Sequence, residues 1–208
     1  MRLMTWVRAR PKTLAATAGV LVGSVVLTGM AMAYDGLPTA KVELNDAGVW
    51  LTKSSKLLVG HFNHESTVLD GGLRTSSENY DILQNGPTVL VVDHGNSTLT
   101  AVDPANVSLT DSATIPGDAK VALGDSTAAV LDRASGSLWV LGASEIAGFD
   151  IKGADPIAKL GANADVTVAQ DGTVFAVSPK DGDLVTVPVD DQGAALDPKT
   201  SALEGVKG

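Results

Sequence analysis

The sequence predicts an all-β fold after residue 33, arranged as about four similar four-stranded repeats. Two observations lead to this prediction. Beyond Ala33 no stretch keeps a helical period over three turns, while short apolar runs bounded by Gly, Asp, Asn, Ser and Pro recur along the chain. Four of these runs share one plan, a strand, a short polar turn and a second strand, which returns about every 40 residues.

The four hairpins share this plan of strand, polar turn and strand. They are GVWLTKSSKLLVGHF from Gly48, TVLVVDHGNSTLTAV from Thr88, TAAVLDRASGSLWVL from Thr127 and TVFAVSPKDGDLVTV from Thr173. The equivalent positions Val49, Val89, Ala128 and Val174 are separated by 40, 39 and 46 residues. The last three turns offer Gly or Asn, which accept the positive φ needed to reverse the chain. Both alternating faces of Val89–Val92 and Ala128–Leu131 are apolar, so we expect these strands to be covered on both sides.

A weaker strand is expected on either side of each hairpin. The strands before the hairpins are Lys41–Leu44, Asp81–Gln84, Ala119–Leu123 and Asp165–Ala169, and those after them are Thr67–Leu69, Val107–Thr110, Ala147–Ile151 and Ala194–Leu196. Four strands per unit at a period near 40 are typical of β-propeller blades, here near residues 41–69, 80–115, 119–151 and 165–203. A β-sandwich also strings hairpins together regularly, but the recurring Gly-bearing turn favours the propeller.

The number of repeats predicts an incomplete propeller. Propellers usually close with about 4–8 blades, and the fourth repeat here is a poor one. An unclosed array would leave unpaired strand edges and an exposed blade face. The chain is therefore expected to be a fragment of a longer protein, or else to close by forming oligomers; the sequence favours the fragment.

The N-terminal 33 residues have a different composition from the rest. They carry Arg2, Arg8, Arg10 and Lys12 and no acidic residue, whereas residues 34–208 have a net charge of −13. The uncharged stretch Thr13–Ala33 has 21 residues, enough for one hydrophobic helix across a bilayer. Residues 1–33 are therefore predicted to be a signal peptide or signal anchor, and residues 34–208 an extracytoplasmic domain. Ala31-Met32-Ala33 favours cleavage after Ala33 and secretion, while the length of the apolar stretch favours a membrane anchor.

Composition excludes several classes of function. The chain has no cysteine, which excludes disulfides, a thiol nucleophile and zinc sites with thiolate ligands. Its net charge of −9, with no basic patch, argues against nucleic-acid binding.

No catalytic, cofactor-binding or metal-binding residue is predicted, and no cofactor is expected. His61 and His64 are close in sequence, but on a strand an odd separation points two rings to opposite faces, so they cannot share one metal ion. The pairs Asp181/Asp183 and Asp190/Asp191 are expected in turns, where Asp binds its own backbone. The run Asp132–Trp139 is interpreted as a hairpin, and Trp50 and Trp139 as core residues.

Two segments resemble a known propeller repeat. Asp46-Ala47-Gly48-Val49-Trp50-Leu51-Thr52 and Asp171-Gly172-Thr173-Val174-Phe175-Ala176-Val177 are similar to the D-G-x-V-W-V-T strand opening of NHL- and lyase-like propeller repeats. More specifically, GVWLTKSSKLLVGHFNHESTVLDGG and YDILQNGPTVLVVDHGNSTLTAVDP resemble the N-terminal region of large exported actinobacterial surface proteins. In that family a signal anchor leads into a propeller-like segment, followed by Ig-like or fibronectin type III repeats that have no counterpart in this sequence.

The resemblance implies one function and leaves a second open. We expect a non-catalytic extracytoplasmic interaction or scaffold module of a bacterial cell-surface protein, whose partner is a protein or polysaccharide of the cell envelope. The N-terminal segment, if uncleaved, would add contact with the membrane. The alternative is part of a carbohydrate-active exported protein, a polysaccharide-degrading glycosidase or lyase, because propellers host such enzymes. The absence of a catalytic motif in the sequence favours the non-enzymatic function.

Overall fold

The structure is a computed structural model that describes residues 48–204, all within one compact unit of the chain. The N-terminal segment 1–33 and the strand expected at Lys41–Leu44 lie outside the described residues. Within the described part every regular element is a β-strand, apart from two short 3-10 helices, η1 (Ser54–Lys56) and η2 (Ala143–Gly148). The all-β prediction is confirmed.

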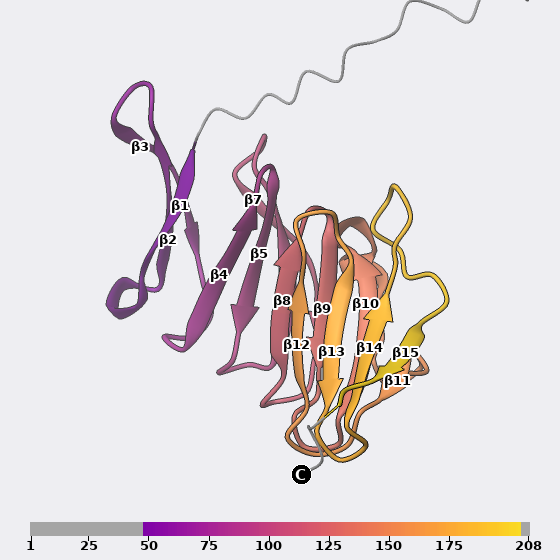
Figure 1. Cartoon of the computed structure of the whole chain (residues 1–208). Coiled ribbons are helices and arrows are strands. Elements are labelled where there is room, and N and C mark those ends of the chain that lie inside the picture. The colour runs from indigo at the N-terminus through magenta and orange to yellow at the C-terminus, as the bar shows by residue number, and fades with distance from the viewer. Residues whose placement is uncertain (1–47, 205–208) are drawn as a thin grey trace, which may run out of the picture. The chain divides into compact units, whose positions relative to one another are not determined.

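The strands form four antiparallel sheets that follow one another in chain order (Figure 1). Three described strands form the first sheet: β1 (Val49–Lys53), β2 (Leu58–Asn63) and β3 (Val68–Arg74). Four form the second: β4 (Tyr80–Asn85), β5 (Thr88–Asp93), β6 (Thr98–Asp103) and β7 (Ser108–Thr114).

The third and fourth sheets also have four strands each. The third contains β8 (Lys120–Gly124), β9 (Thr127–Leu131), β10 (Ser137–Gly142) and β11 (Ala158–Lys159). The fourth contains β12 (Asp165–Val168), β13 (Val174–Ser178), β14 (Asp183–Val187) and β15 (Lys199–Ala202). In every sheet, strands adjacent in the chain are hydrogen-bonded neighbours, which makes each sheet a simple meander.

All four predicted hairpins are present, as β1–β2, β5–β6, β9–β10 and β13–β14. The strands expected before the last three hairpins correspond to β4, β8 and β12, and no boundary differs by more than one residue. The strands expected after the first two hairpins correspond to β3 and β7, and each ends several residues later than predicted.

Two predicted outer strands are wrong. Ala147–Ile151 is not a strand, because η2 occupies its first part and the carboxylate of Asp150 accepts a hydrogen bond from the Lys152 N–H in a turn. Such local bonds compete with strand pairing, and the third sheet instead ends with β11. In the fourth sheet the outer strand is β15 rather than Ala194–Leu196, where Ala195 forms only an isolated bridge with Val189.

The first two sheets repeat with an interval of 40 residues. β2 and β3 have the same lengths as β6 and β7 and precede them by that interval. The left-handed residues Leu57 and Thr67 recur as Ser97 and Val107, and both sheets have a β-bulge between their last two strands. β1 is therefore the counterpart of β5, the second strand of its sheet.

The hydrophobic core lies in three layers, one between each pair of successive sheets. Because side chains alternate along a strand, each inner sheet contributes to two layers. Every residue from Val89 to Val92 and from Ala128 to Leu131 is buried, so the prediction that these strands are covered on both sides is confirmed. The fold thus depends on contact between sheets as much as on pairing within them.

One strand of each sheet lies at a common edge of the array. β4 contacts β8, β8 contacts β12, and β1 contacts β4. Gln84 of β4 joins the first two sheets there: its Nε2 donates to the Gly48 carbonyl at 2.8 Å, and its Oε1 accepts from the Trp50 N–H at 3.1 Å. Charged side chains gather along this edge.

Candidate functional site

A charged cleft of about 350 Å³ lies between the second and third sheets. Its polar lining comes from β4, the β5–β6 turn, the loop before β8, β8 itself and the β9–β10 turn: Asp81, His94, Asp118, Lys120 and Arg133. Leu83, Val92 and Val121 supply apolar lining. The cleft therefore combines both signs of charge with an apolar surface.

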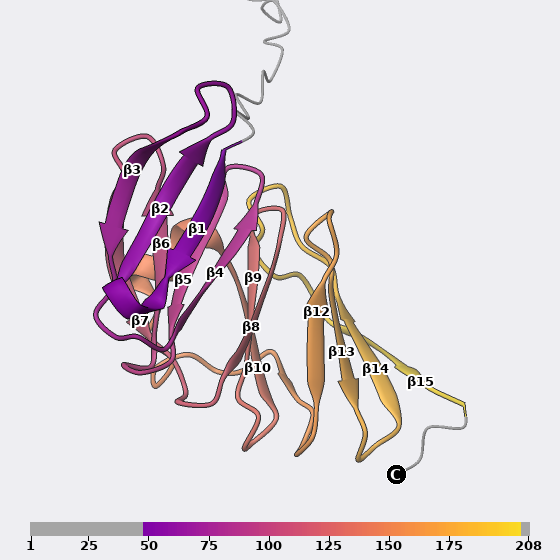
Figure 2. The same cartoon turned by 90° about the vertical axis from the view of Figure 1, so that its left-hand side faces the viewer.

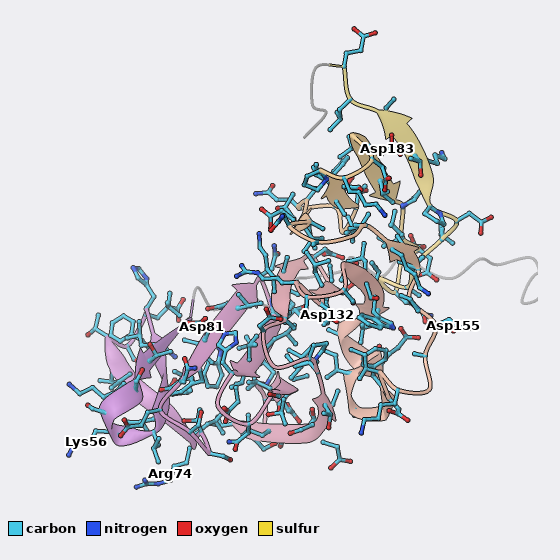
Figure 3. The ribbon with its side chains drawn as sticks, turned by 90° about the horizontal axis from the view of Figure 1, so that it is seen from below. Lys56, Arg74, Asp81, Asp132, Asp155 and Asp183 are labelled. Carbon is cyan, nitrogen blue, oxygen red and sulfur yellow. The ribbon has the colours of Figure 1, made fainter. Side chains whose placement is uncertain are left out.

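Strand alternation directs Asp81 into the cleft and Lys120 toward the fourth sheet. On β4, Tyr80 is buried in the layer against the first sheet, so its neighbour Asp81 faces the third sheet. On β8, Lys120 pairs with Leu131, which is buried against the fourth sheet, so Lys120 lies on the face toward that sheet and reaches the cleft only at the common edge. Figure 3 views this end of the sheets, with Asp81 and Asp132 labelled. Rigid strands therefore fix the positions of Asp81 and Lys120.

One side-chain contact lies within the cleft and one ion pair connects it to the fourth sheet. His94 Nε2 lies 3.1 Å from Asp81 Oδ2, which joins the β5–β6 turn to β4. Lys120 Nζ lies 2.6 Å from Asp165 Oδ1, which joins the third sheet to the fourth. The hydrogen bond from Lys120 lowers the pKa of Asp165 below its ordinary value of 3.8, and the charge of Arg133 acts in the same direction. Asp165 is therefore a stable anion at neutral pH.

Two other cavities lie beside η2. One, of about 380 Å³, is lined by strands of the second sheet together with Ala143, Ser144 and Ala147. The other, of about 450 Å³, is lined by Trp139, Glu145 and Phe149 among others. Both are larger than the charged cleft, but neither gathers charges of both signs from so many elements. The charged cleft is therefore the candidate binding site.

The two histidines considered from the sequence lie in different elements. His61, on β2, places its Nδ1 2.6 Å from Asp70 Oδ1 and its ring 5.0 Å from the Trp50 ring, whereas His64 lies in the following turn. Among residues 48–204 no three His, Asp or Glu side chains are grouped as metal ligands would be. Hydrogen bonds from His61 and Asn63 lower the pKa of Asp70, which keeps its carboxylate ionised.

Asp181 and Asp191 lie in turns as expected and Asp190 directly precedes the second of these turns, but the prediction is wrong for Asp183, which begins β14 and pairs with Ser178. Asp181, in the β13–β14 turn, accepts a hydrogen bond from the Ser178 hydroxyl at 2.9 Å. Asp190 Oδ1 accepts from the N–H groups of Gln192 and Ala194, and Asp132 Oδ2 accepts from the Ser135 hydroxyl at 2.6 Å. The interpretation of Asp132–Trp139 as a hairpin is confirmed, and so is the burial of Trp50. Trp139 is partly buried, and its Nε1–H donates to the Ala154 carbonyl.

Sequence reasoning missed the cleft. It assigned no role to Asp81, Lys120 or Arg133, because which residues meet between two sheets depends on tertiary packing. The sequence did contain one indication of these charges. Asp81, Lys120 and Asp165 each lie at the first or second residue of the strand that precedes a hairpin. Had these strands been aligned, the charges would have fallen at one end of the array.

Comparison with known proteins reveals the fold. No protein-family model matches the chain, and a search of curated proteins finds no match. Among solved structures, dihydro-heme d1 dehydrogenase NirN in complex with DHE is similar, with a TM-score of 0.56 and 12% identity over 83% of this chain and 38% of that one. The fold is β-propeller-like.

Two further structures are more distant. Hydrazine synthase of Kuenenia stuttgartiensis has a TM-score of 0.46 and 12% identity, over 76% of this chain and 47% of its own. The WD40 domain of Toxoplasma gondii coronin has a TM-score of 0.47 and 11% identity, over 71% of this chain and 40% of its own. The chain thus spans less than half the length of each of these structures.

The described residues include no helix long and apolar enough to cross a membrane. The segment Thr13–Ala33, which the sequence assigns to the membrane or to export, lies outside them.

Proposed function

We propose that the β-propeller-like domain is an interaction module that binds a polar segment of a protein partner in the charged cleft. The observation that carries the proposal is the mixed charge of the cleft: Asp81 and Asp118 lie in one cavity with Lys120 and Arg133. A peptide offers amide donors and acceptors and side chains of either sign, which such a cleft can match. Complementary charge contributes mainly specificity and association rate.

We propose that the domain lies outside the cytoplasm and is part of a bacterial cell-surface protein of the kind that the sequence resembles. The basis is the basic, then uncharged, N-terminus followed by an acidic remainder. Protease added to intact cells should digest residues 34–208 if they are anchored at the surface, and the medium should contain them if they are released. Protection of the domain inside intact cells, with none in the medium, would contradict this location.

Charge removal within the cleft tests the binding function. We expect Asp118→Asn and Arg133→Gln each to weaken capture of the envelope partner by roughly 10- to 100-fold, since each removes one charged hydrogen-bonding group. The matched controls are Asp111→Asn and Lys152→Gln, which remove the same charges from exposed positions outside the cleft. Cross-linking to intact envelope at physiological salt, with quantification of the captured protein, gives the comparison. If the cleft variants capture as much partner as the controls, the cleft is not the binding site.

A carbohydrate-active function is the second candidate. It is favoured by one observation, the presence of the two carboxylic acids Asp81 and Asp118 in the same cavity. Glycosidases use two carboxyl groups on either side of the scissile bond. This function predicts release of reducing sugar from envelope polysaccharide by the unmodified chain and its loss in Asp81→Asn. Release of sugar that Asp81→Asn and Asp118→Asn leave unchanged would rule out these residues as the catalytic pair.

A further inference from the structure

One side of the first sheet carries a cluster of exposed apolar residues. Val49 and Leu51 of β1 are 47% and 48% exposed, and Leu69 of β3 is 61% exposed. Cross-strand register places Val49 beside Phe62 of β2 and Phe62 beside Leu69, so these residues share one surface. We define Val49, Leu51, Phe62 and Leu69 as the first face. It lies opposite Trp50 and Val59, which pack against the second sheet, and Figure 2 looks toward it.

The positions that correspond to Val49, Leu51 and Phe62 are buried in every other sheet, whereas Leu109, which corresponds to Leu69, is 39% exposed. Val89 and Val91, which follow Val49 and Leu51 by 40 residues, are 2% and 4% exposed. The set that corresponds to Val49, Leu51 and Phe62 is Val89, Val91 and Val102 in the second sheet, Ala128, Val130 and Leu141 in the third, and Val174, Ala176 and Val187 in the fourth; all are buried. In each case the preceding sheet covers them. The first face therefore has the character of a sheet-to-sheet junction.

The opposite end of the array carries the complementary surface. Phe175, Val177 and Leu184 of the fourth sheet lie in neighbouring cross-strand positions, and all three are partly exposed. We define them as the last face. The corresponding residues of the other sheets, Leu90, Val92 and Leu99 in the second and Ala129, Leu131 and Leu138 in the third, are buried against the sheet that follows. At each of the three junctions, the side of a sheet that corresponds to the last face packs against the side of the next sheet that corresponds to the first face.

The chain itself thus carries both halves of one junction. We propose that the first face of one copy packs against the last face of a second copy, and that two chains close by making this contact twice. Head-to-tail contacts form rings when the rotation closes. Two copies of the described residues 48–204 would bring together two sets of four sheets, which reaches the upper end of the usual range of about 4–8 blades.

Charge at the common edge follows the same repeat. From sheet to sheet the sign alternates at one position, with Asp81, Lys120 and Asp165, and the last two form an ion pair across a junction. A second copy is the occupant that the described residues support, because its first face is the kind of surface that covers the corresponding residues of the second and third sheets. The proposal does not depend on the ligand of the charged cleft, because neither face includes a residue of the cleft.

Engineered cysteines test the contact in the full chain, which has none of its own. We expect chains with Leu51→Cys, co-produced with chains carrying Phe175→Cys, to form a covalent dimer under mild oxidation or with a short bis-maleimide. Either variant alone should stay uncross-linked. The double variant should yield one closed dimer band. Leu109→Cys is the matched control, since Leu109 is an exposed leucine on β7 outside both faces. The reaction can be run in the membranes or medium of the producing cells.

Three results would overturn the proposal. Cross-linking of Leu51→Cys with itself would indicate contact between two first faces. A ladder of higher bands from the double variant would indicate an open filament. Absence of the mixed dimer would mean that something other than a second copy covers the first face.

A charge variant provides an independent measurement. Leu51 is exposed, so Leu51→Asp should leave the fold intact, as a circular dichroism melt can verify. Sedimentation of the full chain should show dimers for the unmodified chain and monomers for Leu51→Asp, and Leu109→Asp should remain dimeric. Equal sedimentation of all three chains would contradict the proposed interface. If the cleft variants lose partner capture but still form dimers, partner binding and dimerisation use different surfaces, and each proposal can then fail without the other.

Discussion

At the scale of single residues, the turns depend on side chains that bind the backbone. Asp93 ends β5, and its Oδ1 accepts from the Asn96 N–H while its Oδ2 accepts from the Asn96 side chain. The Ser77 hydroxyl donates to the same carboxylate. Asp103 makes the corresponding bonds to Asn106, so two successive turns of the second sheet use one device.

The buried Asp93 should make folding stability depend on pH. Burial alone would raise its pKa, but hydrogen bonds from Ser77 and Asn96 outweigh it and lower the pKa below 3.8. The ionised group therefore stabilises the fold above pH 3.8, and this contribution disappears as pH falls through the lowered pKa of the folded state. Urea unfolding between about pH 6 and pH 2.5 should show the difference between the unmodified chain and Asp93→Asn shrinking as pH falls. A constant difference across this range would contradict the assignment, and Asp111→Asn, at an exposed site, serves as the control.

Gly136 is the position where an added methyl group should do most harm. Its φ is +72°, and a Cβ there would lie 2.0 Å from the Gly161 carbonyl oxygen, in the loop before β12. Gly86 also has a positive φ, of +53°, but its Cβ would meet nothing within 4 Å. We expect Gly136→Ala to lower the free energy of unfolding by about 1–3 kcal/mol more than Gly86→Ala. Both substitutions strain the backbone, but only the new methyl group at position 136 would collide with a neighbouring loop. Equal losses in urea melts would show that the loops can separate at little cost.

At the scale of elements, the hairpins were predictable and the outer strands were not. Residues such as Val89–Val92 combine an apolar run with a Gly- or Asn-bearing turn, and both signals are local. β15 (Lys199–Ala202) is exposed throughout, so no apolar alternation marks it, and only pairing with β14 makes it a strand. In η2 the buried Ile146 and the bond from the Gly142 N–H to Glu145 Oε2 decide the local structure. For the charged cleft, strand alignment could have shown that Asp81 lies at one end of the array, but not that it meets Arg133, because that contact forms only when two sheets pack.

Junctions between sheets should dominate stability at this scale. Leu138 is fully buried between the third and fourth sheets, whereas Leu51 is half exposed on the first face. We expect Leu138→Ala to cost about 2–5 kcal/mol and Leu51→Ala less than about 0.5 kcal/mol in the monomeric chain. Urea unfolding at low protein concentration measures both. A large loss for Leu51→Ala under these conditions would show that the first face is already covered within one chain.

At the scale of the whole domain, protection of the backbone should follow the number of neighbouring sheets. The second and third sheets are covered on both sides, while the first has a described neighbour on one side only. In arrays of repeats, each unit gains stability mainly from its neighbours. Hydrogen exchange at low protein concentration should therefore be slowest in β5 and β9 and faster in β1–β3. Uniform exchange would indicate that the domain opens only as one unit.

The 40-residue interval between the first two sheets also has a consequence for the gene. Strand lengths, bulges and left-handed turn positions coincide at that interval. An in-frame duplication or deletion of 40 codons within the two repeats would therefore join each residue to the neighbour that the corresponding residue has in the other repeat. Such an event changes the number of sheets without introducing a new kind of junction. Unequal recombination could thus lengthen or shorten this protein in steps of one blade, each a foldable intermediate for selection.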